Sequence, residues 1–317
     1  MVSEAFANLI GQKQAVALLE RAVAQKRLAP AYLFAGPEGI GRSLTAKAFI
    51  ELLFCLDTSP QEQASIQKRL RQANHPDVLW VEPTYLHNGK LLSVREAVQK
   101  GLQRKTPPQI RLEQIREIGK FLACSPLEAK RKVVVLEKAE TMAEPAANGL
   151  LKTLEEPGLA TLILIAPSTE SLLATLISRC QRIPFSRLAR SEMEDVLKQT
   201  GHQEILQESL LLEIAQGSPG EAIASFAQLK AISPELLNQL VKLPKTLRKA
   251  LELAKEIDKT LDAQTQLWLL DYLEHSYWRT FAEPSILQKL EKARKYLLGY
   301  AQARLVWEVT LLELCQR

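Results

Sequence analysis

Eight consecutive residues near the N-terminus have the types and spacing of a loop that binds phosphate. The run is Gly36-Pro37-Glu38-Gly39-Ile40-Gly41-Arg42-Ser43. In the common phosphate-binding loop, G-x-x-x-x-G-K-S/T, the glycines let backbone N–H groups surround the phosphates, the lysine reaches the β- and γ-phosphates and the hydroxyl binds Mg²⁺. Here Arg42 takes the lysine position, and its planar guanidinium is not equivalent to an ammonium at a tight phosphate site. The loop therefore predicts a nucleotide site with impaired chemistry.

The predicted elements around this loop suit it. An apolar run at residues 31–35 leads into the loop and a helix is predicted over 43–56, which is the strand, loop and helix order that such a loop needs. Residues 132–136 and 161–166 are apolar, as strands buried on both faces of a parallel sheet are. Further elements are a strand at 78–81 and helices at 12–25, 110–121 and 146–155. Strands that alternate with helices predict a parallel α/β sheet.

Beyond about residue 185 the strand signals end and the pattern predicts helices with breaks at Gly and Pro. We expect an α/β domain over residues 1–185, a small helical domain over 186–229 and an all-helical domain over 230–317. Within the last domain, residues 285–314 are expected to form one long amphipathic helix. Five aromatic residues are expected in the core of the helical bundle or at an interface: Trp268, Tyr272, Tyr277, Trp278 and Trp307.

Composition places the chain among ordinary globular proteins. Apolar residues make up 46% and charged residues 24% of its 317 residues. The N-terminus lacks a basic segment followed by an apolar core, and no stretch approaches the roughly 18 apolar residues of a membrane span, so we expect a cytoplasmic protein. The cysteines show no C-x-x-C pair and are expected to be free thiols. They are Cys55, Cys124, Cys180 and Cys315.

Positive charge is concentrated in one part of the chain. The net charge is +5, and residues 90–132 hold eleven Lys and Arg against four Glu. Such a stretch could face nucleic acid or an acidic neighbouring subunit. A solvated helical face explains it equally well, because residues 111–120 mix both signs at helical spacing. The sequence leaves these alternatives open.

Two further segments carry a resemblance to a known family. Residues 148–157, NGLLKTLEEP, closely resemble a segment peculiar to bacterial clamp-loader subunits, and residues 177–180, ISRC, resemble the S-R-C motif of that family. The match runs from about Phe6 to Ile183 and continues in weaker form to the C-terminus. Together with the altered phosphate loop, it makes the chain similar to the delta-prime type of DNA polymerase III clamp-loader subunits, which are AAA+ proteins.

This resemblance implies an architecture, partners and a role. It implies a RecA-like α/β domain, a small helical lid and a helical collar through which five subunits join in a ring. The partners would be clamp-loader ATPase subunits of the gamma/tau type and a delta subunit, and through the complex the sliding clamp and primed DNA. The role would be to help load the clamp onto that DNA, within a holoenzyme that has DNA-directed DNA polymerase activity.

Several catalytic positions of the family are altered here. After the strand at 132–136 an active relative carries Asp-Glu, to hold Mg²⁺ and to polarise the attacking water, whereas this chain has Glu137-Lys138. Glu137 keeps a carboxylate for the metal, but a charged Lys138 has no lone pair and cannot act as a base. The strand that would end in a sensing Thr or Asn ends at Ala166, and the arginine of a second sensor motif is replaced by Gly220.

We therefore predict no ATPase activity of its own for this chain and no required cofactor. The vestigial nucleotide site comprises Gly36, Gly39, Gly41, Arg42, Ser43 and Glu137. Weak ATP or ADP binding stays open, because backbone N–H groups at a helix N-terminus attract anions whatever the side chains. The alternatives are an active gamma-type ATPase and a DNA-binding protein that acts alone.

Arg179, in the S-R-C segment, is the one catalytic residue that the resemblance assigns. In the family the matching arginine reaches into the ATP site of the neighbouring subunit, as an arginine finger in trans. The alternative from spacing alone is that Arg179 caps the C-terminus of the preceding helix, where a cation is favourable.

Delta-prime relatives commonly carry a four-cysteine zinc module after the helix of the phosphate loop. Here Cys55 is alone in that region, and one thiolate cannot make a structural zinc site. His75 and His87 are expected at the surface or in turns. We predict no zinc and assign no metal.

Overall fold

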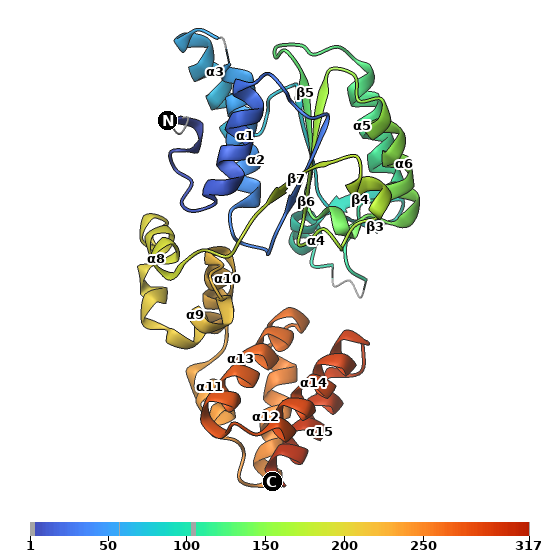
Figure 1. Cartoon of the computed structure of the whole chain (residues 1–317). Coiled ribbons are helices and arrows are strands. Elements are labelled where there is room, and N and C mark those ends of the chain that lie inside the picture. The colour runs from blue at the N-terminus through green and yellow to red at the C-terminus, as the bar shows by residue number, and fades with distance from the viewer. Residues whose placement is uncertain (1–3, 57, 103–105, 317) are drawn as a thin grey trace. The chain divides into compact units, whose positions relative to one another are not determined.

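The computed structural model describes residues 4–56, 58–102 and 106–316 (Figure 1). The chain forms two compact units, Met1–Glu192 and Met193–Arg317. The division into three domains at 185/186 and 229/230 stays a prediction. Among the described residues no helix combines the length and the apolar character that crossing a bilayer requires.

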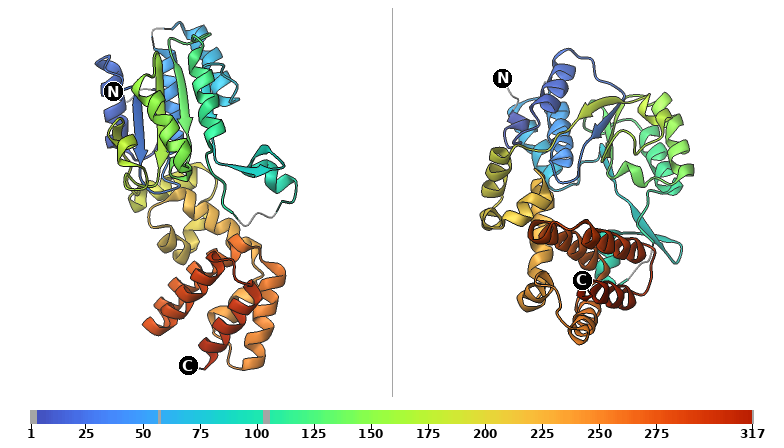
Figure 2. Two further views of the ribbon diagram at one scale, coloured as in Figure 1. Left: turned by 90° about the vertical axis from the view of Figure 1, so that its right-hand side faces the viewer. Right: turned by 60° about the horizontal axis from the view of Figure 1, so that its bottom comes forward.

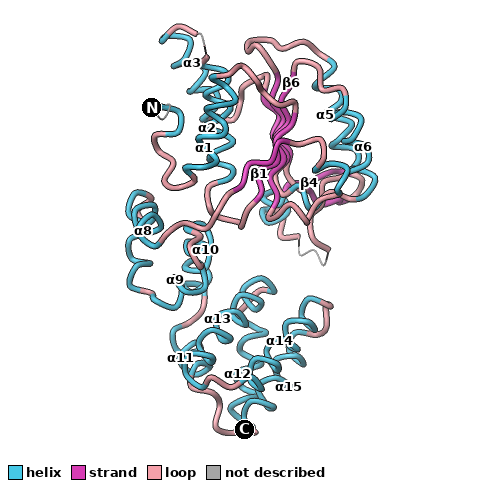
Figure 3. Tube along the Cα trace, viewed as in Figure 1, coloured by secondary structure: helices cyan, strands magenta, loops and turns pink. Residues whose placement is uncertain are grey.

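A five-stranded parallel sheet forms the centre of the first unit (Figure 3). The strand order is β2-β5-β6-β1-β7. The strands are β1 (Ala31–Ala35), β2 (Val78–Val81), β5 (Lys132–Leu136), β6 (Ala160–Ala166) and β7 (Gln181–Pro184). Strands β5 and β6 are buried along their whole length, which explains why they are apolar except at Lys132 and Thr161. The predicted parallel α/β fold is confirmed.

Helices cover both faces of this sheet (Figure 1). On one face lie α1 (Lys13–Ala24) and α2 (Arg42–Cys55), and on the other lie α5 (Leu112–Ala123) and α6 (Glu144–Glu155). The sequence predicted all four to within two residues at each end. It did not predict α3 (Pro60–Arg71), which packs on α2, because α3 buries none of its residues and so has no apolar stripe.

A small antiparallel hairpin stands apart from the main sheet (Figure 2). Its strands are β3 (Thr84–His87) and β4 (Lys90–Ser93), and α4 (Val94–Gln99) follows. Asn88 and Gly89 form the turn with φ of 48° and 75°, the left-handed geometry that an Asn-Gly pair favours in a two-residue hairpin. The sequence analysis missed this hairpin, although the Asn-Gly pair was the signal that could have found it.

The second unit is helical. Its helices are α8 (Arg190–Gln199), which begins before the boundary, α9 (Ser209–Ala215), α10 (Pro219–Ala231), α11 (Pro234–Val241), α12 (Leu247–Thr260), α13 (Ala263–Phe281), α14 (Pro284–Leu298) and α15 (Ala303–Cys315). Trp268, Tyr277 and Trp307 are buried in one apolar core, as expected, whereas Trp278 is 51% exposed. The indole N–H of Trp268 donates to Ser225 Oγ at 3.0 Å, so α13 packs on α10 across the predicted 229/230 boundary.

The expectation of one long helix over residues 285–314 is wrong. Helix α14 ends at Leu298 and α15 begins at Ala303, because Tyr300 has a φ of 59° that no right-handed helix can contain. Tyr300 and Leu305, which were placed on one apolar stripe, are 57% and 54% exposed.

Candidate functional site

The phosphate loop lies between β1 and α2, as the sequence predicted. Gly39 and Gly41 have φ of 72° and 99°, a left-handed backbone conformation that is strained for residues with a Cβ atom. A Cβ atom on Gly36 would lie 2.4 Å from the carbonyl oxygen of Phe185, so the backbone after β7 leaves no room for one. The glycines thus shape a loop that leads directly into the N-terminus of α2.

Arg42 is the first residue of α2 and is only 7% exposed. Burial lowers the pKa of its guanidinium, while Glu38, Glu137 and Glu140 oppose that change. In the described part of the chain its Nη1 atom has no hydrogen-bond partner. The arginine is therefore a buried cation in the field of three carboxylates of its own chain, which partly offset the charge that it could offer to a phosphate.

Ser43 and Glu137 are brought together by neighbouring loops. Strand β6 pairs with both β1 and β5, so the loops after β1 and β5 share the carboxyl edge of the sheet. The Ser43 hydroxyl donates to Glu137 Oε1 at 2.6 Å. A hydroxyl and a carboxylate are the ligands that Mg²⁺ uses beside nucleotide phosphates, so these two oxygens fit that ion.

Lys138 reverses the charge where an active relative has its catalytic acid. Its backbone is left-handed, with φ of 51°, and its Nζ lies 3.0 Å from Glu38 Oε1 in the phosphate loop. Both side chains are about half exposed. The charged ammonium of Lys138 has no lone pair, so it can neither accept a proton from the attacking water nor accept a hydrogen bond that would orient this water.

Glu140 is a residue of this site that the sequence analysis missed. Burial raises the pKa of its carboxyl, against the nearby charge of Arg42, and its Oε2 has no hydrogen-bond partner among the described residues. It lies in the short 3-10 helix Ala139–Thr141 that follows Lys138. No motif marks it in the sequence, because its partial burial and its proximity to the charge of Arg42 come from the fold.

Strand β6 ends at an apolar residue, as the sequence predicted. Its last residue is Ala166, whose carbonyl accepts a hydrogen bond from the Gly36 N–H at 3.2 Å, and Pro167 follows. In the second unit, Ser218 caps α10 through the N–H of Glu221 at 3.2 Å, and Gly220 lies in the first turn of that helix.

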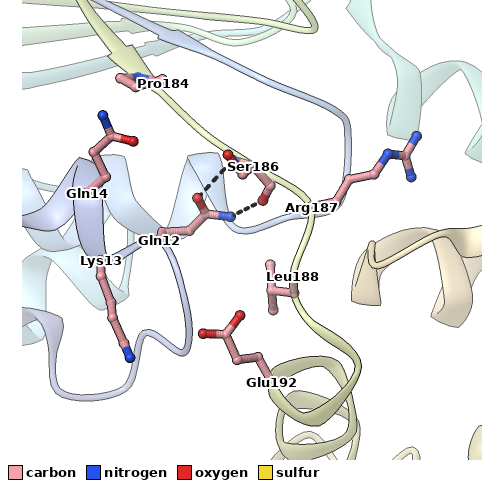
Figure 4. Close-up of a pocket in the computed structure, with 8 residues that line it drawn as sticks. All are labelled: Gln12, Lys13, Gln14, Pro184, Ser186, Arg187, Leu188 and Glu192. Carbon is pink, nitrogen blue, oxygen red and sulfur yellow. Dashed lines mark hydrogen bonds between the residues drawn. The ribbon is translucent and has the colours of Figure 1, made fainter.

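A polar pocket of about 130 Å³ lies beside the start of α1 (Figure 4). The Gln12 amide spans two segments there: Nε2 donates to Ser186 O at 2.6 Å and to Ile40 O at 3.2 Å, and Oε1 accepts from the Ser186 N–H at 3.1 Å. The amide therefore connects the phosphate loop to the segment that follows β7. The lining carries two cations, Lys13 and Arg187, and one carboxylate, Glu192.

Arg179 lies at the surface, two residues after α7 (Ala174–Ile177). Its Nη2 donates to Glu155 Oε1 at 2.7 Å, and its Nη1 donates to the carbonyl oxygen of Thr175 at 3.0 Å. The second bond is the helix-capping contact that spacing alone suggested. The side chain is still 36% exposed, so the guanidinium keeps donors that can meet a group outside the chain.

Comparison with known proteins identifies the family. Residues 11–189, more than half of the chain, match the family described as "DNA polymerase III, delta subunit", and residues 191–314 match "Cyanobacterial DNA polymerase III delta prime, C-terminal domain". The chain belongs to the DNA polymerase III delta family. Within it the chain is delta-prime-like, in agreement with the resemblance seen in the sequence.

Individual relatives agree with this family. DNA polymerase III subunit delta' of Bacillus subtilis is 34% identical over 189 residues, which cover 59% of this chain and 51% of that protein. Subunit tau of the same organism is 27% identical over 73% of this chain and 39% of its own length. The chain thus spans about half the length, or less, of these curated relatives.

A solved structure supports the fold. A DNA polymerase III gamma subunit-related protein of Thermotoga maritima aligns with a TM-score of 0.56 at 17% identity, over 96% of this chain and 99% of that one. At such a low sequence identity the alignment supports the fold and no more, and that fold agrees with the predicted RecA-like AAA+ domain followed by helices.

The basic stretch of this delta-prime-like chain lies on several elements. Lys90 is at the start of β4, Arg95 lies in α4 and Lys100 directly follows it, and all three are exposed. Arg116 and Lys120 are exposed on α5. Residues 103–105, which add two further cations to the stretch, lie outside the described residues. The choice between nucleic acid and protein as its partner stays open.

The cysteines are free thiols, as expected. Burial raises the pKa of Cys180 to about 11, so this thiol stays protonated at neutral pH. No group of three or more His, Cys, Asp or Glu side chains in the described ranges could hold a metal ion. His75 begins a turn, in which its carbonyl accepts the N–H of Val78 at 3.2 Å, so the expectation of a turn is confirmed. Its side chain is buried rather than at the surface, because it packs on Phe54 and accepts the N–H of Asp77 at 3.2 Å.

Proposed function

We propose that this chain is a non-hydrolysing, delta-prime-like subunit of a DNA polymerase III clamp loader. The observation that carries the proposal is Lys138, a cation paired with Glu38 at the position where an active relative would hold the carboxylate that acts as its catalytic base. Proton transfer to a positioned base contributes about 10² to 10⁴ in rate, and an ammonium cannot supply it. The absence of a polar sensor at Ala166 and of an arginine at Gly220 removes further interactions with the transferred phosphate.

Nucleotide binding by the loop is at most weak under this proposal. The negative charges of Glu38, Glu137 and Glu140 act on Arg42, and an incoming triphosphate would have to compete with them for its charge. The backbone N–H groups at the start of α2 are the remaining attraction for an anion. The loop then serves mainly to keep the shape of the AAA+ domain.

The active contribution of this chain is Arg179, donated in trans to the ATP site of a neighbouring gamma/tau-type subunit. A finger needs an exposed guanidinium on a firm support, and Arg179 is 36% exposed beside residues anchored in the core. An arginine in this role is worth about 10³ to 10⁵ in the rate of phosphoryl transfer. The Glu155 pair does not prevent it, because an exposed ion pair contributes only about 0 to 1 kcal/mol.

The partners in this proposal are gamma/tau-type ATPase subunits and a delta subunit in a ring of five, working in the cytoplasm on the sliding clamp and primed DNA. The relatives named above include a tau subunit as well as a delta-prime subunit. The helical unit also exposes apolar side chains suited to assembly. Among the described residues they include Leu247, Leu251, Trp278, Tyr296, Leu298, Tyr300, Leu305 and Val309.

Two measurements test the proposal. The purified chain should hydrolyse no ATP above background, and the complex reconstituted with its ATPase subunits should lose turnover when Arg179 is replaced by Ala. Turnover by the lone chain that Ser43→Ala abolishes would establish the gamma-type ATPase instead. Full activity of the Arg179→Ala complex, with Arg182→Ala as the matched control for a neighbouring exposed arginine, would remove the finger.

A further inference from the structure

We infer that Glu155 is a positioning residue for Arg179: it holds the guanidinium at the angle from which it enters the neighbouring ATP site. The inference rests on the proposed function and deepens it. It concerns a residue of the NGLLKTLEEP segment that neither the family match nor the relatives assign to any role.

The backbones of both residues are fixed by one apolar core. Leu154, directly before Glu155, is 4% exposed, and Leu176, three residues before Arg179, is fully buried in the same cluster. Helix α6, which ends at Glu155, and helix α7, which ends two residues before Arg179, pack on each other. The fold thus fixes the backbone positions from which the two side chains extend, and the ion pair between them fixes the orientation of the guanidinium.

Two acceptors then orient the arginine. The Glu155 carboxylate accepts a hydrogen bond from Arg179 Nη2 at 2.7 Å, and the Thr175 carbonyl accepts one from Arg179 Nη1 at 3.0 Å. Ser178 Oγ donates to the same carbonyl at 3.0 Å, so this acceptor is already shared. A long side chain loses much rotamer freedom when it is ordered, and two contacts on the same planar group order it before any partner arrives.

The charged acceptor is the stronger of the two. A hydrogen bond from a guanidinium to a carboxylate is about twice as strong as one between neutral groups. The remaining N–H groups of Arg179 stay available, because the side chain is 36% exposed. Glu155 therefore supports the finger without occupying all of its donors.

Glu156 offers a matched control on the same helix end. It is equally acidic and exposed, and it follows Glu155 directly. Its backbone N–H caps α6 by donating to the Lys152 carbonyl, a contact that a change of the side chain leaves in place. Glu155 differs from it in having Arg179 as its ion-pair partner.

The test uses the reconstituted complex and measures the part of ATP turnover that depends on Arg179, which is the wild-type rate minus the Arg179→Ala rate. Glu155→Ala should reduce this part by about tenfold with KM for ATP unchanged, since misplacing a catalytic group by about 1 Å can cost up to 10²-fold. Glu155→Gln, which keeps an acceptor oxygen, should retain most of it. Glu156→Ala should match the wild type.

Three outcomes separate the inference from the proposal beneath it. Wild-type turnover in Arg179→Ala sinks the finger itself, whereas loss in Arg179→Ala combined with full turnover in Glu155→Ala sinks only the role of Glu155. Faster ATP turnover in Glu155→Ala would also overturn the positioning role of Glu155, because it would show that the ion pair holds Arg179 back from the neighbouring ATP site. The Glu155→Ala/Arg179→Ala double variant should equal Arg179→Ala, and unchanged thermal unfolding and assembly should exclude a merely structural effect.

Discussion

Asp77 has no exposed surface, yet its carboxylate stays ionised. It accepts three consecutive backbone N–H groups, those of Leu127, Glu128 and Ala129, each at 2.8 Å. Burial raises the pKa of this carboxyl, but the three hydrogen bonds, together with the nearby His75, lower it by more, so the pKa lies below its usual value. One side chain thereby fixes a whole loop, whose tip presents Leu127 with 77% exposure.

Replacing Asp77 should be costly. Asp77→Asn puts an amide where three N–H groups converge, and we expect the free energy of unfolding to fall by about 2 to 4 kcal/mol, because buried donors lose a charged acceptor. Urea denaturation at pH 7 measures it, with the exposed Asp258→Asn as the control expected to stay within about 0.5 kcal/mol of the wild type. A loss of similar size in both variants would contradict this account.

The same carboxylate predicts a pH dependence. A carboxyl whose pKa is depressed in the folded protein stabilises it above the unfolded pKa of about 3.9, and that contribution is lost as pH falls through the folded pKa. The gap in urea midpoint between the wild type and Asp77→Asn should therefore be constant from pH 7 to about pH 5 and narrow below about pH 4. A gap that does not change with pH would show that the three hydrogen bonds do not depend on the charge.

At the scale of elements, Gly36 is where the phosphate loop and the segment after β7 come closest. Gly36→Ala would place a Cβ 2.4 Å from the Phe185 carbonyl oxygen, and backbone cannot yield cheaply, so we expect a loss of about 1 to 3 kcal/mol. Gly119, exposed in α5 with nothing within 4 Å of its Cβ position, is the control. Gly119→Ala should stabilise by about 0.5 to 1 kcal/mol. Thermal unfolding of both variants compares them, and equal effects would refute the steric argument.

The sequence predicted the elements whose patterns are strong. Strands β5 and β6 are apolar because helices cover both faces, and α2 is marked by the loop before it, so the fold class followed. Strand β7 was missed because its pattern is mostly exposed, with Ile183 as its buried residue. Local patterns report burial, and an element that buries little gives little signal.

The candidate site was predictable to the extent that motifs mark it. Ser43 and Glu137 were assigned to the site from separate segments, and Ser43 Oγ lies 2.6 Å from Glu137 Oε1. The partial burial of Glu140 near Arg42 and the Glu155–Arg179 ion pair could not be predicted, because each depends on two segments that meet only through the packing of the sheet and its helices.

At the scale of the whole molecule, the exposed apolar side chains of the helical unit call for a partner. Leu305 and Val309 lie four residues apart on α15 and are 54% and 50% exposed. The double variant Leu305→Lys/Val309→Lys should keep the thermal midpoint of the isolated chain, since both side chains are already in water. Its assembly with gamma/tau-type and delta subunits should weaken by at least about tenfold, because desolvating two charges opposes an apolar contact.

Size-exclusion chromatography and sedimentation of the mixed subunits measure that loss. Leu127→Lys is the control, because it changes in the same way a leucine of the first unit that is still more exposed, at 77%. Assembly that survives the double variant would mean that this surface of α15 is not used.

The pairing of Lys138 with Glu38 also bears on how this chain could change over time. An acid restored at position 138 by itself would lose the ion pair that now joins Lys138 to Glu38 and would put a second carboxylate near it. Both side chains are about half exposed, so this cost is small, on the order of the 0 to 1 kcal/mol of an exposed ion pair. A change of Glu38 would remove that cost, so a return to hydrolysis is favoured by a second substitution in the phosphate loop.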